Sequence, residues 1–292
     1  MKYVDDFLEY LKVVKKHSEN TIINYQVDIL EFKDYVKDKI LDIDKETVNG
    51  YLNYLYDEKV SKSTISRKLS SLRTFYNYLL DKEIIEMNYL SFIKNPKKDK
   101  RLPRFVSDNN VDKMLMIPDT RKPLGQRNLV IMRMLYATGV RVSELVNIKV
   151  KDIEINERTI KILGKGSKER IVVFGVNTQK DLKRYLDDGR YKLDTNGSKY
   201  LFLNKDGNKL SSRYVRKILD ETIVKASIEM HVSPHMLRHT FATEMLNNGA
   251  DLVSVKDLLG HESLNTTSIY THVSDDKIRQ IYDMAHPRAH HK

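Results

Sequence analysis

Cysteine is absent from this chain of 292 residues, and so are long apolar runs. Without cysteine there are no disulfide bonds, no thiolate metal ligands and no cysteine nucleophile, so any catalysis must use other side chains. No stretch approaches the roughly 20 apolar residues that span a bilayer, and the segment from Met1 to Glu9 is mixed and acidic rather than signal-like. These absences predict a cytoplasmic protein that does not associate with a membrane.

Basic residues are present in excess and are unevenly distributed. The chain carries 51 lysines and arginines against 40 aspartates and glutamates, a net charge of +11. Residues 1–100 hold 18 basic and 17 acidic groups, whereas residues 101–292 hold 33 and 23. An excess of positive charge is typical of nucleic-acid binding, and its asymmetry indicates two modules.

The first module has a helical pattern. From Tyr3 to about Leu90, apolar residues recur at spacings of three and four and glycine is scarce, which predicts four helices. In the second helix, Ser18 is suited to cap the N-terminus. Its broad apolar face consists of Ile22, Ile23, Tyr25, Ile29, Leu30, Phe32 and Tyr35. This pattern predicts a compact helical bundle.

A basic linker follows the bundle. The segment Asn95–Arg104 contains two prolines, five basic residues and no helical periodicity, which marks an extended connection. We place a helical domain at residues 1–94, the linker at residues 95–106 and a second domain at residues 107–292. The length and the 40% hydrophobic content suffice for two such domains.

The second domain combines helices with a small sheet. One long helix ends at Gly139. Strand patterns occupy Val150–Ile155, Thr159–Leu163 and Arg170–Phe174, with a glycine-flanked turn before the last. Further helical patterns cover Ser211–Ala226, His235–Asn248, Leu252–Leu259, Ser263–Tyr270 and Asp275–Ala285. The predicted fold class is mainly α with a small antiparallel β-sheet, a helical bundle followed by an α+β domain.

Two arginines are placed to hold an anion. His235 and Arg238 lie three residues apart at the start of a helix, where backbone N–H groups favour negative charge. Arg141 stands at the start of a short helix that also carries Glu144. Two guanidinium groups can clamp one phosphate. The plainer interpretation of Arg141 is an ion pair with Glu144, and both interpretations are open.

Three further residues become candidate site residues only in combination with these two arginines. Lys165 lies at the tip of the glycine-flanked turn, where an exposed lysine is commonplace. His261 follows the end of a predicted helix, and Tyr270 comes nine residues later. Each of the three is unremarkable alone.

A zinc site is the competing interpretation of the histidines. His235 and His239 lie at i and i+4 of one helix, and His261 would complete a set of three. Arg238 would place a fixed positive charge between these ligands, and neither an H-E-x-x-H pattern nor a cysteine is present. The cluster suits an anion better than a zinc ion.

Four more basic residues are candidates for DNA contacts. Arg67 and Lys68 lie on the fourth predicted helix, and Arg213 and Arg216 lie near the start of a later one. Basic residues beside small hydroxyl residues suit phosphate contacts, but a solvated helix face has the same pattern. The sequence does not decide between the two.

Five segments together resemble the signature of the tyrosine recombinase family. They are Ala137–Leu145, Gly164–Arg170, His235–Arg238, Leu258–His261 and Tyr270–His272. The resemblance extends to Ser18–Tyr25, which is similar to the family's SAM-like core-binding domain, and to Ala285–Arg288, which is similar to the tail of the Xer type. It covers nearly the whole chain, with no departure at the catalytic positions.

The resemblance implies how the site handles DNA. Arg141 and Arg238 would hold the non-bridging oxygens of the scissile phosphate, His235 and His261 would complete the pocket, and Tyr270 would attack in line. Fixed guanidinium and imidazole groups stabilise the charge that phosphoryl transfer develops, so neither a metal ion nor ATP is implied. Tyrosine suits reversible joining, because a phenol pKa of about 10 makes phenolate a better leaving group than a sugar alkoxide.

The remaining implications concern protons and partners. Lys165 would donate a proton to the departing 5′ oxygen, and His235 would assist deprotonation of the phenol. The product would be a 3′-phosphotyrosyl link, with strands exchanged on two duplexes by four protomers, of this chain alone or with a paralogue. A DNA translocase is a candidate activator. The apolar stripe of the last helix, Ile278, Ile281, Tyr282 and Ala285, would dock on a neighbouring protomer, although such helices also pack on their own domain.

The implied function is site-specific recombination, with resolution of chromosome or plasmid dimers at segregation as the leading expectation. An integrase of a phage or mobile element is the alternative. The bundle begins at about Tyr3, which leaves no room for the arm-binding module common in such integrases, and the His286–Arg288 ending favours the Xer type. A non-catalytic DNA-binding protein is disfavoured, because all six active-site residues are present.

Overall fold

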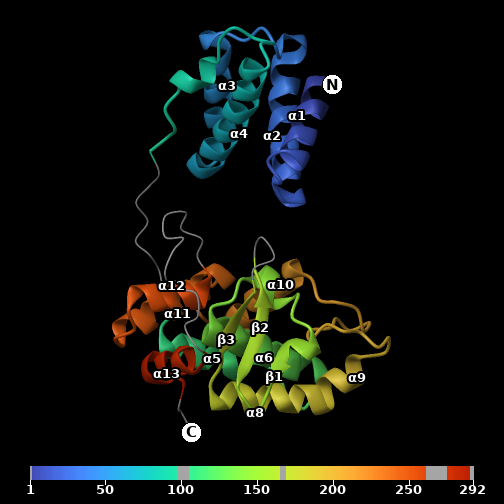
Figure 1. The fold of residues 1–292 in the computed structure, drawn as a ribbon, viewed down its shortest axis with the longest axis vertical. Helices are drawn as coiled ribbons and strands as arrows, with labels where there is room; N and C mark the ends of the chain where they lie inside the picture. Colours follow the sequence, from blue (N-terminus) through green and yellow to red (C-terminus); the bar gives the residue numbers. More distant parts are fainter. Residues whose placement is uncertain (1, 98–104, 165–168, 261–274, 290–292) are drawn as a thin grey trace. The chain divides into compact units, whose positions relative to one another are not determined.

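The computed structural model describes residues 2–97, 105–164, 169–260 and 275–289 (Figure 1). The chain divides into two compact units, Met1–Leu102 and Pro103–Lys292. Hydrophobic residues gather in separate clusters in the two units, so each unit has its own interior. Within these described ranges, no helix is long and apolar enough to span a membrane.

The first unit contains the four predicted helices. They are α1 (Lys2–Val13), α2 (Glu19–Val36), α3 (Lys45–Asp57) and α4 (Lys62–Asp81), with short 3₁₀ segments at Lys37–Lys39 and Tyr89–Phe92. Side chains satisfy free N–H groups where helices begin, and the predicted cap Ser18 accepts a bond from the Thr21 backbone at 3.3 Å. Asp44 caps α3 in the same way at 2.8 Å.

Aromatic side chains fill the interior of this bundle. Phe7 and Phe75 lie with ring centroids 5.2 Å apart, and Phe32 and Tyr51 with centroids 4.8 Å apart, both pairs in edge-to-face geometry. All four are fully buried. Rings of this size remove much apolar surface from water, so a few of them stabilise a small bundle.

The second unit has the predicted mixture of helices and sheet. The helices of its described part are α5 (Asp108–Met116), α6 (Pro123–Thr138), α7 (Val142–Leu145), α8 (Val176–Arg184), α9 (Tyr191–Leu193), α10 (Ser212–Lys225), α11 (Pro234–Asn247), α12 (Leu252–Leu259) and α13 (Asp275–Ala285). The predicted fold class is thus confirmed. The segment between Phe174 and Ser211, for which the sequence pattern predicted no helix, contains α8, a π-helical turn and α9.

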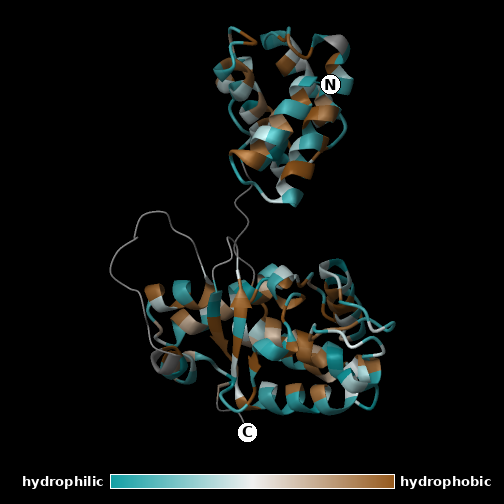
Figure 2. Ribbon diagram, turned by 45° about the vertical axis from the view of Figure 1, so that its right-hand side comes forward, coloured by the Kyte–Doolittle hydropathy of each residue, from teal (hydrophilic) through white to brown (hydrophobic). Residues whose placement is uncertain are grey.

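The sheet is antiparallel in the order β1 (Ile153–Glu154), β2 (Thr159–Leu163) and β3 (Glu169–Val173). Its strands are mostly hydrophobic, as Figure 2 shows. The first predicted strand is shorter than expected, because Val150–Asp152 forms a 3₁₀ turn. The Asp152 carboxylate accepts a bond from the Lys149 backbone at 3.1 Å, which closes that turn.

Helix α6 runs through the interior of the unit. Val130, Ile131, Met134 and Leu135 are fully buried, and the helix contacts α8, α11 and β3. Most of its residues, including all from Met134 to Thr138, are buried, as expected for a helix inside a domain. The C-terminal end of α6 therefore lies among other elements, which places Gly139 and Arg141 next to α11 and α12.

Helix α13 packs on its own unit, against α11, α12 and β3. Tyr282 and Ala285 are buried, the Asn248 side chain donates to the Ala285 carbonyl at 2.9 Å, and Arg158 pairs with Asp283 at 3.0 Å. The apolar stripe predicted for this helix is thus covered within one chain. Its exchange between protomers stays a prediction.

Candidate active site

A glycine in the left-handed backbone conformation sets the position of Arg141. Gly139 ends α6 with φ +58°, and a Cβ there would lie 2.7 Å from a Phe241 ring atom and 2.8 Å from the Leu259 side chain. Only glycine fits this turn without strain. Arg141 follows two residues later at the N-cap position of α7, and its backbone N–H donates to the Glu144 carboxylate at 2.8 Å.

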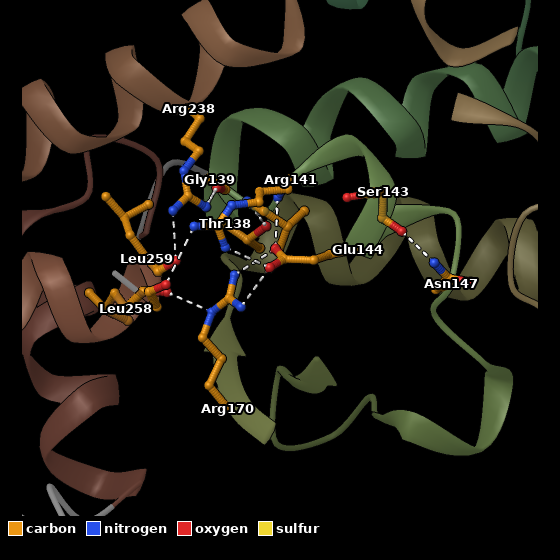
Figure 3. A network of polar contacts seen from close by, with 12 residues as sticks. Thr138, Gly139, Arg141, Ser143, Glu144, Asn147, Arg170, Arg238, Leu258 and Leu259 are labelled. Atoms are coloured by element: carbon orange, nitrogen blue, oxygen red, sulfur yellow. Dashed lines mark hydrogen bonds and ion pairs between the residues drawn. The ribbon is translucent and has the colours of Figure 1, made fainter. Parts of the chain in front are cut away.

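Arg238 lies on the first turns of α11 and reaches two helix ends. Its Nη1 donates to the Gly139 carbonyl at 2.6 Å and its Nη2 to the Leu259 carbonyl at 2.7 Å (Figure 3). Carbonyls at helix C-termini lack helical partners and carry partial negative charge, which suits a guanidinium. The residue is only 8% exposed, so its orientation is fixed.

Arg141 lies beside Arg238 and is more accessible. Its Nη1 donates to Glu144 at 2.9 Å and its Nη2 to the Gly260 carbonyl at 3.4 Å. Its side chain is 35% exposed. The structure therefore brings together the two arginines that the sequence singled out, and it also forms the Arg141–Glu144 ion pair that was the plainer interpretation.

A third arginine, which the sequence reasoning did not select, completes this network. The guanidinium of Arg170 on β3 donates to both carboxylate oxygens of Glu144, at 3.0 and 2.8 Å. Burial alone would raise the pKa of Glu144, but the hydrogen bonds and charges of Arg170 and Arg141 outweigh it and lower the pKa. Glu144 is thus an ionised carboxylate shared by two arginines.

The electrostatics of the network favour an anion. Burial and the nearby positive charge of Arg141 lower the pKa of Arg238 to about 10, so the guanidinium is protonated at neutral pH but destabilised. Arg141 and Arg170 pair with Glu144, whereas Arg238 bonds to backbone carbonyls, so the described network holds three guanidinium groups and one carboxylate. A phosphate placed between Arg141 and Arg238 would supply the missing negative charge.

His235 lies at the second position of α11, one turn before Arg238, and it is exposed. The other three candidates, Lys165, His261 and Tyr270, lie outside the described residues. The zinc interpretation also needs His261. In the part of the chain that the structure describes, no cluster of three or more potential metal ligands occurs.

The candidate DNA contacts differ in their surroundings. Arg67 and Lys68 of α4 pair with the buried Asp28 of α2, and Lys68, whose side chain is 7% exposed, also pairs with Glu31. These contacts give Lys68 a structural role within the bundle. Figure 1 shows α10 in the second unit, which carries the remaining candidates, Arg213 and Arg216, both exposed.

The chain matches two models of one protein family. Residues 104–277 match the model described as the phage integrase family. Residues 4–83 match the model described as phage integrase, N-terminal SAM-like domain. Together the two matches cover most of both units.

Relatives with similar sequences match over nearly their full length. The tyrosine recombinase XerC of Bacillus pumilus is 43% identical over 97% of this chain and 95% of its own length. The XerC of Bacillus subtilis is 39% identical over 99% and 98%. A solved structure of the XerH site-specific recombinase bound to a palindromic difH substrate, a post-cleavage complex, has a TM-score of 0.71 at 25% identity and covers 96% of this chain and 83% of its own.

Proposed function

This chain belongs to the phage integrase family of tyrosine recombinases, which cleave and rejoin DNA, and we propose that it resolves chromosome or plasmid dimers at segregation. Its similarity to XerC proteins over nearly their whole length supports this biological role. In this proposal the protein works in the cytoplasm on a specific duplex site. An integrase of a phage or mobile element is the alternative.

The observation that carries the catalytic proposal is the pairing of Arg141 with Arg238. Both guanidiniums approach the C-terminal end of α12, through the carbonyls of Gly260 and Leu259. Two fixed cations at one place bind the two non-bridging oxygens of a phosphodiester and stabilise the charge that grows on them during transfer. The two arginines need not move when the reaction begins, because hydrogen bonds within the protein already hold both side chains.

The proposed reaction conserves the phosphodiester bond energy. The Tyr270 oxygen attacks phosphorus, the bond to the 5′ oxygen breaks, and a 3′-phosphotyrosyl link forms. The phenol proton passes to His235, and Lys165 donates a proton to the departing 5′ oxygen. His261 completes the phosphate pocket. Attack by a 5′ hydroxyl on the phosphotyrosine then rejoins the strand.

The DNA contacts and the assembly are part of the same proposal. We assign residues 1–94 to core binding, residues 95–106 to a linker along the DNA, and residues 107–292 to catalysis. Arg213 and Arg216 are the proposed contacts of α10, and Arg67 is the proposed contact of α4. Four protomers act on two duplexes, with α13 exchanged between neighbours, with or without a paralogue and a translocase activator.

A nicked suicide duplex tests the chemistry. The site is taken from the duplexes that the protein itself selects from a random pool, and the nick traps the covalent intermediate. We expect a slowly migrating protein–DNA adduct on a denaturing gel from the intact chain and none from Tyr270→Phe, while both bind the duplex in a gel shift. Duplex binding without an adduct, with and without a candidate paralogue, would contradict the catalytic proposal.

A further inference from the structure

Arg170 joins three elements of the candidate active site. It lies on β3, and its forked guanidinium contacts both oxygens of Glu144 in α7. Its Nε donates to the carbonyl of Leu258 in α12 at 3.1 Å. One side chain therefore ties β3 to α7 and α12, as Figure 3 shows.

Glu144 passes this contact on to Arg141. The carboxylate oxygens that accept from Arg170 also accept from the Arg141 side chain at 2.9 Å and from its backbone N–H at 2.8 Å. A carboxylate held by a bidentate arginine on one side has a fixed plane, so it presents a fixed acceptor to the arginine on the other side. Loss of Arg170 would leave Glu144 free to turn and Arg141 free to follow it.

Arg170 also packs on the end of α12. Gly260 has φ +64°, and a Cβ there would lie 3.1 Å from the Arg170 Cδ and Nη1 atoms. The carbonyls of Leu259 and Gly260, at this same helix end, accept from Arg238 and Arg141. The segment that Arg170 holds in place thus supplies acceptors for both arginines.

We propose that Arg170 is a positioning residue for DNA cleavage. It orients Arg141 through Glu144 and fixes the α12 end that both arginines use, without touching the phosphate itself. This inference rests on the proposed function. Small errors in the placement of groups that stabilise a transition state slow the reaction strongly. Loss of the Arg170 contacts should therefore lower the cleavage rate much more than it lowers the affinity for DNA.

The test compares Arg170 with a matched arginine outside the site. Arg190 is equally buried, with 12% of its side chain exposed against 13% for Arg170, and it pairs with Asp194 and donates to the Tyr200 carbonyl. Arg170→Gln and Arg190→Gln each remove one such set of contacts. Arg170→Lys is a milder change that keeps the charge but loses the fork.

We expect Arg170→Gln and Arg170→Lys to slow single-turnover cleavage of the nicked duplex by up to about 100-fold at saturating protein, with DNA affinity nearly unchanged. Arg190→Gln should lower the unfolding temperature comparably but cleave at the wild-type rate. Arg170→Lys keeps the comparison valid if Arg170→Gln does not fold.

The same Arg170 substitution in a chain that already carries Arg141→Lys separates a positioning role from a purely structural one. In an Arg141→Lys chain, which has lost the guanidinium that contacts Glu144 and the Gly260 carbonyl, Arg170→Lys should slow cleavage much less than it does in the intact chain. Equal slowing in both backgrounds, or wild-type rates for both Arg170 variants, would overturn the positioning role while wild-type cleavage stands. An intact chain that binds the duplex but forms no adduct would overturn the proposed function and this inference with it.

Discussion

Gly139 both ends a helix and supplies a hydrogen-bond acceptor to the candidate active site. Its positive φ of +58° ends α6, and its carbonyl accepts the Arg238 guanidinium at 2.6 Å. The space beside it is already filled by Phe241 and Leu259. Since a side chain would meet both neighbours, the residue that turns the chain toward Arg141 also fixes the carbonyl that holds Arg238.

Gly139→Ala should therefore impair both stability and catalysis. We expect a loss of about 1–3 kcal/mol in the free energy of unfolding, from the left-handed backbone and the clash together, measured by urea denaturation. Gly197→Ala is the control, because Gly197 has φ +64° but nothing within 4 Å of an added Cβ. It should lose only about 1 kcal/mol and retain cleavage. Equal losses of unfolding free energy in the two variants would mean that the clash with Phe241 and Leu259 does not contribute to the effect of Gly139→Ala.

At the scale of elements, local signals were enough to predict most helices. The cap Ser18 and the helix end at Gly139 both act within a few residues, and the structure has both. The helical elements between Phe174 and Ser211 were not predicted, because their buried positions include polar or small residues such as Thr178 and Gly189, so the apolar pattern is weak. Helix α8 and the π-helical turn pack on α6, and α9 packs on that turn, so tertiary contacts stabilise them instead.

The same limit applies to the site. Arg141 and Arg238 could be selected because each lies near the start of a helix in a recognisable segment. The role of Arg170 could not be predicted, because it depends on how β3 lies against Glu144, 26 positions away in sequence, and Leu258, 88 positions away. No local pattern encodes such distances.

A buried carboxylate joins α2 to α4 in the first unit. Asp28 is fully buried, accepts a bond from Ser71 at 2.7 Å, and pairs with Arg67 and Lys68. Removing one partner from such a group leaves a buried charge with weaker compensation. We expect Asp28→Ala to lower the free energy of unfolding of the first unit by about 3 kcal/mol in chemical denaturation.

The control for this substitution lies on the same helix. Asp34 of α2 is exposed, and Asp34→Ala should change stability by no more than about 0.5 kcal/mol. A similar small loss for Asp28→Ala would mean that the buried ion pairs contribute little to the packing of α2 on α4.

A buried histidine anchors the C-terminal end of α13. The His286 ring stacks on Tyr282 with centroids 4.7 Å apart, and its Nδ1 accepts a bond from the Arg288 backbone at 3.1 Å. Burial lowers the pKa of His286 from 6.5 to about 3. The folded protein therefore keeps this ring neutral, while the unfolded chain takes up a proton below pH 6.5.

Stability of the second unit should consequently fall on acidification. The contribution of His286 is complete above pH 6.5 and is lost as the pH falls toward 3, because only the unfolded state binds the proton in that window. Between pH 7 and pH 5 the loss is at most about 2 kcal/mol. His286→Phe keeps a flat ring but cannot titrate, so its free energy of unfolding should fall less over the same range. Identical pH dependence in both proteins would contradict this account.

At the scale of the whole molecule, the two units have separate interiors. The hydrophobic cluster around Phe75 includes residues only from the first unit, and the cluster around Phe202 includes residues only from the second. Most of the positive charge belongs to residues 101–292. A division of this kind implies that each unit unfolds by itself.

Phe75→Ala tests this independence. Phe75 is fully buried in the first unit, and loss of a buried phenylalanine costs about 3–5 kcal/mol, so the unfolding transition of that unit should move to a lower temperature in calorimetry. The transition of the second unit should stay in place. Phe202→Ala, at an equally buried position of the second unit, should show the reverse. If either substitution moved both transitions together, the units would be coupled. A change in the first unit would then also affect the arginine network of the second unit.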